Sequence, residues 1–242
     1  MGNRPRAGFC NVIRMHIRPT LRIQSIGFCI GSTFFALGAV PGLASLMGAT
    51  TTDVLFFIGS WFFTGSAFIQ LQLAGPRMIP YKGGHAVSAV WLVASTQFVG
   101  TILFNISTGA AIEAHAVKAE QINVWTPNAA GSVAFLISGA FAILGLVRSH
   151  EVMKLIYRDS FSGWANMIGC IAFGVSAVGG YVYSNGATAD SYLANLGTLI
   201  GGVCFFLASM FYVGRAGAKP AAPSAFAAAG IAGGAPASAA GA

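Results

Sequence analysis

The sequence contains very few charged residues for its length. Only 8% of its 242 residues are Asp, Glu, Lys or Arg, whereas 55% are hydrophobic. A water-soluble globule of this size needs more polar surface, so this composition argues against a soluble fold. Several apolar stretches reach the roughly 20 residues that a helix needs to cross a bilayer. The sequence therefore predicts a polytopic membrane protein.

Patterns that support catalysis or metal binding are also scarce. None of the cysteines forms a short Cys-x-x-Cys spacing, which argues against a disulfide framework or a zinc site. No Gly-x-Ser-x-Gly elbow, His-Glu-x-x-His pair or phosphate-binding loop occurs. Glu113, His115 and Glu120 are metal-ligand types, but Glu113 and His115 cannot share one helical face. We therefore expect a solvated loop here, and no catalytic residue, cofactor or metal.

The sequence does contain six long apolar segments. They predict transmembrane helices at 23–46, 53–74, 86–107, 128–147, 162–183 and 191–213. The chain is divided into a basic arm (1–22), three transmembrane hairpins (23–75, 86–147 and 160–214) and an Ala/Gly/Pro tail (216–242) expected to be disordered. The predicted fold is all-α, a bundle of six helices built from three repeated antiparallel hairpins.

The basic residues predict the orientation of these spans. Twelve of the thirteen Lys and Arg residues fall on one side of the predicted topology, and only Lys118 falls on the other. Basic loops face the cytoplasm, so we expect a multi-pass protein of the plasma membrane with both termini in the cytoplasm. The same residues predict contact with anionic lipids at the inner face, in preference to nucleic acid.

A short pattern recurs in all six segments. A small residue is followed by phenylalanine four positions on and by another small residue three further, and the three positions lie on one helical face. In lipid, small residues let helices approach closely, so we interpret this face as a helix-packing stripe. The six stripes are Gly31, Phe35, Gly38; Gly59, Phe63, Ser66; Ala94, Phe98, Thr101; Gly131, Phe135, Ser138; Gly169, Phe173, Ser176; and Gly201, Phe205, Ala208.

The first and last hairpins are also similar in sequence, since IGSTFFALGAVPG (30–42) aligns with IGCIAFGVSAVGG (168–180). We therefore predict three hairpins of one ancestry. The stretches IGSTFFALGA, IGSWFFTGSAF and GSVAFLISGAF resemble the paired Gly-Ser…Phe helices of the YrhK-like membrane domain family. The middle hairpin departs from that pattern by using Ala94-Ser95 in place of Gly-Ser. The resemblance implies a compact transmembrane hairpin domain, here in three copies, and implies no activity.

Polar side chains inside the predicted spans are few. No ionisable residue lies centrally in any span, which disfavours proton-coupled transport through a carboxylate relay. Gln97, Asn105 and Asn166 are candidates for a polar cavity. The alternative for each amide is an interhelical hydrogen bond, which contributes only about 0.6 kcal/mol on average.

Three functions remain open from the sequence. The first is a non-enzymatic scaffold or accessory subunit, which binds a membrane-protein partner or a second copy of itself through small-residue faces. The alternative is a uniporter or channel for a small neutral solute, lined by Gln97, Asn105 and Asn166. A third, weaker hypothesis is a membrane enzyme that acts on a lipid headgroup with His150 and Glu151 of the inner basic loop.

Overall fold

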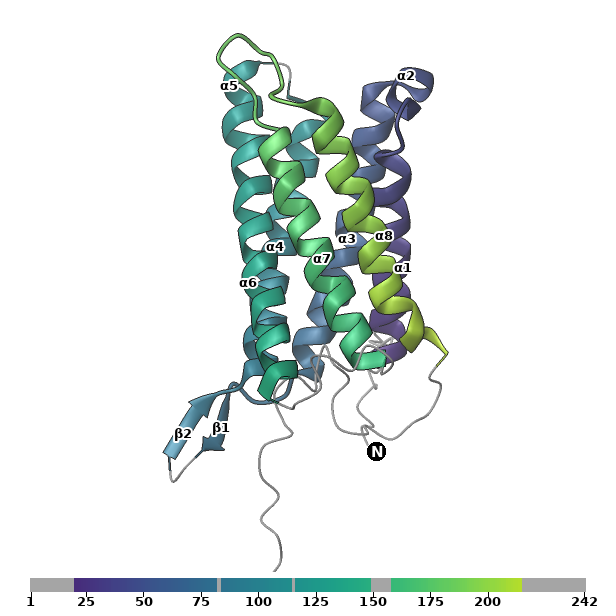
Figure 1. The fold of residues 1–242 in the computed structure, drawn as a ribbon. Coiled ribbons are helices and arrows are strands. Elements are labelled where there is room, and N and C mark those ends of the chain that lie inside the picture. The colour runs from purple at the N-terminus through teal and green to yellow at the C-terminus, as the bar shows by residue number, and fades with distance from the viewer. Residues whose placement is uncertain (1–19, 82–83, 115, 149–157, 215–242) are drawn as a thin grey trace, which may run out of the picture.

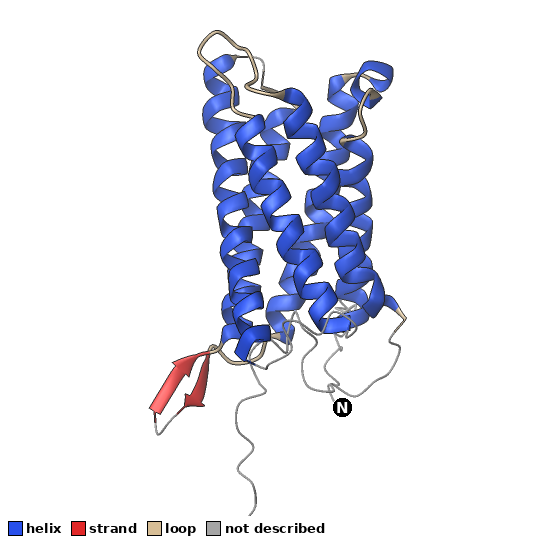
Figure 2. Ribbon diagram, in the orientation of Figure 1, coloured by secondary structure: helices blue, strands red, loops and turns tan. Residues whose placement is uncertain are grey.

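A computed structural model of the chain describes residues 20–81, 84–114, 116–148 and 158–214. Most of the predicted basic arm, the tail, His115, and the inner-loop pair His150 and Glu151 lie outside these residues. The prediction of an all-α protein with six apolar helices long enough to cross a membrane is confirmed, and Figure 2 shows one small two-stranded ribbon beside them. The structure is therefore that of an integral membrane protein.

Each of the six predicted spans overlaps one long helix. The long helices are α1 (Leu21–Gly38), α3 (Ala49–Leu73), α4 (Ala89–Ala111), α6 (Thr126–Arg148), α7 (Arg158–Gly179) and α8 (Ser191–Val213). Between them lie α2 (Leu43–Met47), β1 (Met78–Tyr81), β2 (Gly84–Val87), α5 (Val117–Ala119) and the π-helix η1 (Glu120–Trp125). Polar caps begin α1, α4 and α8, since Thr20, Ser88 and Asp190 each accept a backbone N–H from the first turn.

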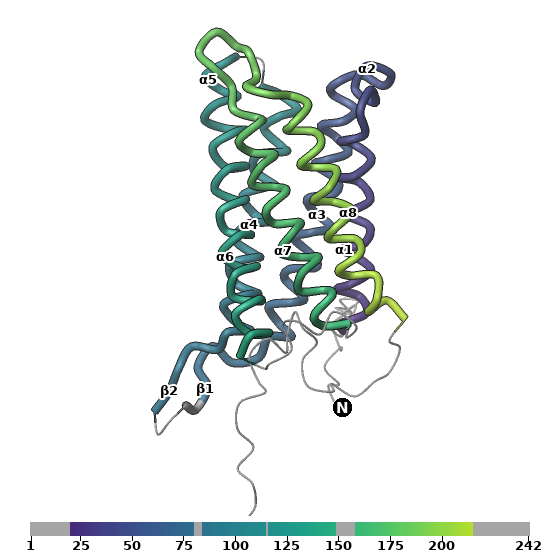
Figure 3. Tube along the Cα trace, in the orientation of Figure 1, coloured from purple at the N-terminus to yellow at the C-terminus, as the bar shows by residue number. Residues whose placement is uncertain are grey.

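The six long helices form a closed ring, in which each packs against two others (Figure 1, Figure 3). The order around the ring is the order along the chain, and α8 packs back against α1. We call the end that carries α2 and α5 the distal end, and the end where α1 begins and α8 ends the proximal end. The axis of the ring runs parallel to the helices through its centre, and the core phenylalanines lie along this axis.

Glycine and phenylalanine make the same reciprocal contact in the first and last helix pairs. Between α1 and α3, a Cβ on Gly31 would lie 2.7 Å from Cδ2 of Phe63, and a Cβ on Gly59 would lie 3.0 Å from Cδ2 of Phe35. Between α7 and α8, the corresponding distances are 2.9 Å from Gly169 to Phe205 and 3.0 Å from Gly201 to Phe173. Each glycine therefore makes room for the ring of the opposite helix.

The middle pair, α4 and α6, makes this contact through residues of α4 that lie six positions beyond the predicted stripe. A Cβ on Gly131 of α6 would lie 2.6 Å from Cδ1 of Phe104, and a Cβ on Gly100 would lie 3.0 Å from Cδ1 of Phe135. The stripe of α4 that matches the other five is thus Gly100, Phe104 and Ser107. Phe98 is only half-buried and packs against Phe68, with ring centroids 5.9 Å apart.

The other predicted stripe residues of α4 have a different role. Ala94 and Thr101 are fully buried, and neither lines the cavity described below, whereas Phe104 and Ser107 do. Thr101 donates its hydroxyl proton to the carbonyl of Phe98 at 2.7 Å, and Ala94 belongs to a small cluster with Ala74 and Val90 at the proximal end.

In three helices, the residue that follows the stripe glycine (Ser60, Ser132 or Gly202) contacts a helix of the neighbouring pair. Thr108 of α4 donates to Oγ of Ser60 on α3 at 3.1 Å, and Ser132 of α6 donates to the carbonyl of Phe173 on α7 at 3.3 Å. Gly202 lets α8 pack closely against α1, because a Cβ at this position would lie 3.0 Å from the backbone N of Ala36 on α1. A glycine followed by a second small residue thus lets a helix approach both of its neighbours.

Several helix ends differ from the prediction because of local turns. The first span was predicted to reach residue 46, but α1 ends at Gly38, and Gly42 adopts φ 84° before the separate helix α2. A β-ribbon occupies the segment between α3 and α4, where Met78 pairs with Val87. The segment between the predicted spans 86–107 and 128–147, where a solvated loop was expected, is largely helical in its described residues, because α4 continues to Ala111 and η1 leads directly into α6.

Candidate functional site

A cavity of about 470 Å³ lies in the distal half of the ring, and residues from α1, α3, α4, η1, α6, α7 and α8 line it. Its floor consists of the buried rings of Phe35, Phe104 and Phe173, one from each helix that runs from the proximal to the distal end. The walls rise from this floor to residues of the distal end such as Thr50 and Ala114. The cavity is therefore a chamber on the axis of the ring.

The floor is two aromatic layers deep. Phe35, Phe104 and Phe173 form a triangle with centroid separations of 6.2, 5.6 and 5.7 Å. The rings of the three returning helices lie below, with Phe63 and Phe135 each in contact with Phe205 at 5.5 and 5.7 Å. These six phenylalanines, which we call the phenylalanine plug, close the axis with apolar edge-to-face and tilted contacts.

The π-helix η1 shapes the wall of the cavity near the distal end. Its residues Val124 and Trp125 line the cavity. Ser107 of α4 donates to the carbonyl of Val124 at 2.8 Å, and the indole N–H of Trp125 donates to the carbonyl of Ala177 at 2.8 Å. A π-helix leaves carbonyls without regular partners, and such turns often occur at functional sites. Here Ser107 connects η1 to α4, and Trp125 connects it to α7.

Four hydroxyl groups of the wall, those of Ser107, Thr108, Ser176 and Thr198, are hydrogen-bonded within the protein. Ser176 and Thr198 lie 2.7 Å apart between α7 and α8, and Ser176 also donates to the carbonyl of Ala194. Thr108 contacts Ser60 and its own helix backbone. These groups therefore give the wall a fixed polar lining.

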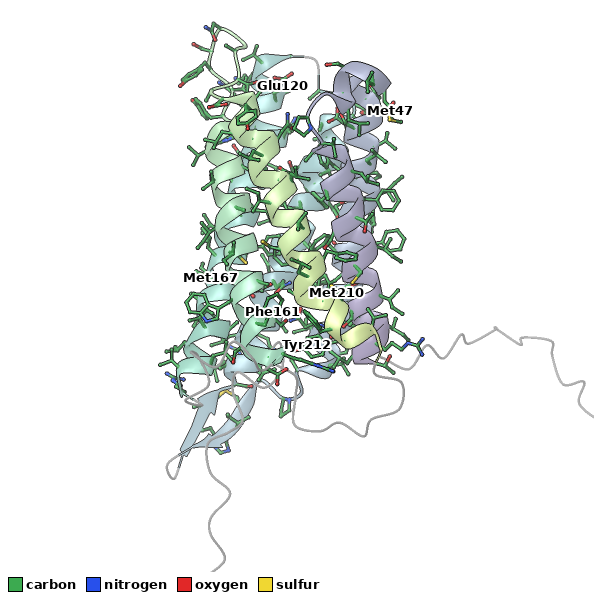
Figure 4. All side chains as sticks on the ribbon, turned by 45° about the vertical axis from the view of Figure 1, so that its right-hand side comes forward. Met47, Glu120, Phe161, Met167, Met210 and Tyr212 are labelled. Carbon is green, nitrogen blue, oxygen red and sulfur yellow. The ribbon has the colours of Figure 1, made fainter. Side chains whose placement is uncertain are left out.

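Two carboxylates line the same cavity. Asp53 belongs to the second turn of α3, and Glu120 begins η1 at the distal end, where Figure 4 shows it. Both are half-buried, and neither forms a hydrogen bond or ion pair with another residue in the described part of the chain. Among the described residues that line the cavity, none is Lys, Arg or His. The chamber is thus acidic.

Sequence reasoning missed both carboxylates as site residues. The predicted span at 53–74 began at Asp53, and Glu120 was expected in a solvated loop, whereas α3 begins at Ala49 and Glu120 begins the π-helix η1. A signal for Asp53 was present, because Asp53, Phe56 and Phe63 share one face of α3 at helical spacing. Glu113 is exposed and lies outside the cavity lining.

A buried amide layer lies on the proximal side of the plug. Gln70, Gln97 and Asn166 each stand two helical turns, about 10 Å, from the plug phenylalanine of their own helix. They are 3%, 0% and 0% exposed. Nearer the proximal end, where Figure 4 shows Tyr212, its hydroxyl donates to Asp159 in the first turn of α7 at 2.5 Å. The interior below the plug therefore contains buried amide groups.

These amides make few hydrogen bonds with the described residues. Both amide atoms of Gln70, Nε2 of Gln97 and Oδ1 of Asn166 have no partner there. Ser138 approaches Oε1 of Gln97 at 3.3 Å, but its proton has a shorter path of 2.9 Å to the carbonyl of Val93. Asn105 also has an unpartnered buried Oδ1, and it lines neither this layer nor the cavity. The predicted trio is therefore divided, with Gln97 and Asn166 in the amide layer and Asn105 apart.

We expect Gln97→Met to leave the bundle at least as stable as the wild type. Burial of an amide without full hydrogen bonding costs about 1–3 kcal/mol, and methionine fills a similar volume without that cost. The measurement is the thermal unfolding midpoint in detergent. Ser138→Ala is measured beside it, because Ser138 is the residue whose hydroxyl approaches Oε1 of Gln97. A clear loss of stability in Gln97→Met would mean that this amide holds helices together, as the hydrogen-bond interpretation predicted.

No protein-family model, curated protein or solved structure matches this chain. The fold and the cavity therefore define the class of protein, an integral membrane protein with six candidate spans in a closed ring.

Proposed function

We propose that this protein is a non-enzymatic passage that admits a small solute along the axis of its helix ring, as a channel or uniporter. The observation that carries the proposal is the cavity of about 470 Å³ enclosed by the ring and closed at its floor by phenylalanine. Its volume lies within the roughly 300–1,000 Å³ typical of small-molecule sites. The plug acts as a closed hydrophobic gate, and the amide layer below it offers the next polar contacts on the axis.

The buried amides support this proposal because a buried amide without hydrogen-bond partners lowers the stability of a bundle that has only a structural role. Gln70 and Gln97 lie on adjacent helices, and Asn166 comes from the other side of the ring. Unpartnered polar groups in a membrane interior are characteristic of solute pathways. A solute or water that passes the plug would supply the hydrogen bonds that the described residues do not.

The glycine stripes favour a passage over a scaffold. A scaffold needs small-residue faces that are free to receive a partner helix. Gly31, Gly59, Gly131, Gly169 and Gly201 are all buried against neighbouring helices of the same chain. The small-residue faces on which the scaffold hypothesis rested are thus occupied by contacts within the ring.

We further propose that the proximal end faces the cytoplasm of a plasma-membrane protein. The described basic residues Arg22, Arg77, Arg148 and Arg158 lie at that end, whereas Lys118 lies at the distal end. Basic residues on the cytoplasmic side also favour contact with anionic lipids. In this orientation the acidic cavity opens toward the outside, and both termini are cytoplasmic.

A common origin of the three hairpins remains part of the proposal. It is supported by the repeated glycine–phenylalanine contact and by the even spacing of Gly31, Gly100 and Gly169 along the chain. Kinship with the YrhK-like membrane domain rests on the sequence resemblance alone.

Flux through proteoliposomes tests the passage. We expect wild-type protein to raise the permeability of vesicles to at least one small solute in a panel that contains glycerol, choline and alkali cations. Ala111→Trp places a bulky ring in the cavity wall and should abolish the increase. Ala140→Trp is the matched control, because Ala140 is exposed on the outer side of α6 and does not line the cavity. Permeability equal to that of empty vesicles for every solute would overturn the proposal.

A further inference from the structure

The charge of the cavity points to the class of solute. Asp53 and Glu120 reach the cavity from α3 and η1, which are separate in sequence, so their convergence is a property of the fold. Neither is paired with a described residue, and the described lining contains no base. Low-dielectric walls concentrate the field of such carboxylates, which attract cations and repel anions.

The surroundings of the cavity strengthen this field. Glu113 and Asp190 are exposed at the distal end, and the basic residue Lys118 there is exposed and does not line the cavity. A cation that approaches the distal end therefore meets mainly carboxylates. This distribution would raise the local concentration of cations at the entrance and slow the approach of anions.

The floor of the cavity suits an organic cation better than a compact metal ion. The rings of Phe35, Phe104 and Phe173 line it, with Phe56 and Trp125 in the walls. Aromatic faces bind alkylammonium groups by cation–π attraction, and their apolar surface also receives the methyl groups. A bare metal ion instead needs several oxygen or nitrogen ligands, and the described residues contain no group of three or more His, Cys, Asp or Glu that could hold one.

We propose that the distal cavity binds a small organic cation of the alkylammonium class, with Asp53 and Glu120 facing its charge and the plug phenylalanines facing its alkyl groups. This inference deepens the proposed passage, because it names the solute that the distal chamber accepts. It replaces the neutral solute expected from the sequence, since that expectation was formed without a carboxylate in the cavity.

Binding of choline and of its neutral isostere 3,3-dimethyl-1-butanol to the purified full-length protein tests the proposal. The two probes have nearly the same shape and differ in charge. We expect calorimetric titration to show choline binding that is about tenfold tighter, which corresponds to about 1.4 kcal/mol. Equal affinity for the two probes, or no measurable binding of choline, would overturn the proposal.

Charge-neutralising variants locate the site. Asp53→Asn and Glu120→Gln, singly and together, should weaken choline binding and leave the affinity of the alcohol unchanged. Asp190→Asn is the comparison variant, because it removes an exposed distal charge outside the lining and retains an N-cap residue for α8, and it should weaken choline binding less than either lining variant does. Unfolding midpoints confirm that each variant is folded, and undiminished choline binding in both folded single variants would refute the assignment.

The titration tests the cation site and the flux assay tests the passage, so the two proposals can be contradicted separately. Choline binding without any solute flux would retain the cation site and remove the passage. Flux of glycerol without preference for choline, together with equal binding of the two probes, would retain the passage and remove the cation site.

Discussion

Replacing Gly197 with alanine is expected to destabilise the bundle by about 3 kcal/mol, the upper part of the usual range for overpacking. A Cβ at this position of α8 would lie 2.6 Å from the carbonyl O of Ala172 and 2.7 Å from the backbone N of Ser176. Both atoms belong to the backbone of α7, so no side-chain rotation relieves the contact. The two helices would have to separate along their interface.

The effect should appear as a lower unfolding midpoint and a smaller yield of monodisperse protein in detergent. Gly65→Ala is the matched control, because a Cβ on Gly65 of α3 meets no atom within 4 Å. Alanine is the better helix former by about 1 kcal/mol, so this variant should be unchanged or slightly more stable. If both variants had the same stability, close helix approach at glycine would not be what holds the ring together.

Replacing Phe104 with alanine is expected to raise solute flux several-fold above that of the wild type. The ring is 3% exposed and lies between the cavity and the second aromatic layer, with centroids 4.8 Å from Phe135 and 5.6 Å from Phe173. Its loss removes one of the three floor rings and lets the chamber extend toward the amide layer. A hydrophobic constriction that is widened in this way wets more readily.

The same change also removes core packing, which costs about 3–5 kcal/mol for a buried phenylalanine. Flux is therefore measured at a temperature where the variant is folded, and Phe104→Leu provides a milder version of the same opening. Phe98→Ala is the control on the same helix, since Phe98 is half-buried beside Phe68 and does not line the cavity. Equal flux in Phe104→Ala and Phe98→Ala would mean that the plug is not the gate.

The sequence placed the packing face of α4 on the wrong residues, and the helix itself shows the reason. Two stripes on α4 satisfy the same spacing, one through Phe98 and one through Phe104. They differ by six residues, so local periodicity does not distinguish them. The choice is made by α6, where Gly131 has room for the ring of Phe104 only. The contact partner of a stripe is a property of two helices together.

The amides illustrate a second limit of sequence reasoning. Gln97 and Asn166 can be singled out from the sequence as polar residues in apolar spans, whereas Gln70 was not among the candidates. Their common level below the plug depends on where each helix places its phenylalanine on the axis. Depth in a bundle follows from helix register, and register is set by contacts between residues far apart in the chain.

The sequence by itself determined that the chain forms six apolar helices, because the length of each apolar run and the scarcity of charge leave a transmembrane helix as the way to satisfy its backbone. It also supplied the small residues that permit close packing. Only the tertiary structure decided that the helices close into a ring, that six phenylalanines meet on its axis, and that Asp53 and Glu120 line one cavity. The physical reason is that a cavity is enclosed by residues from every part of the chain, whereas local spacing specifies only which residues share the face of one helix.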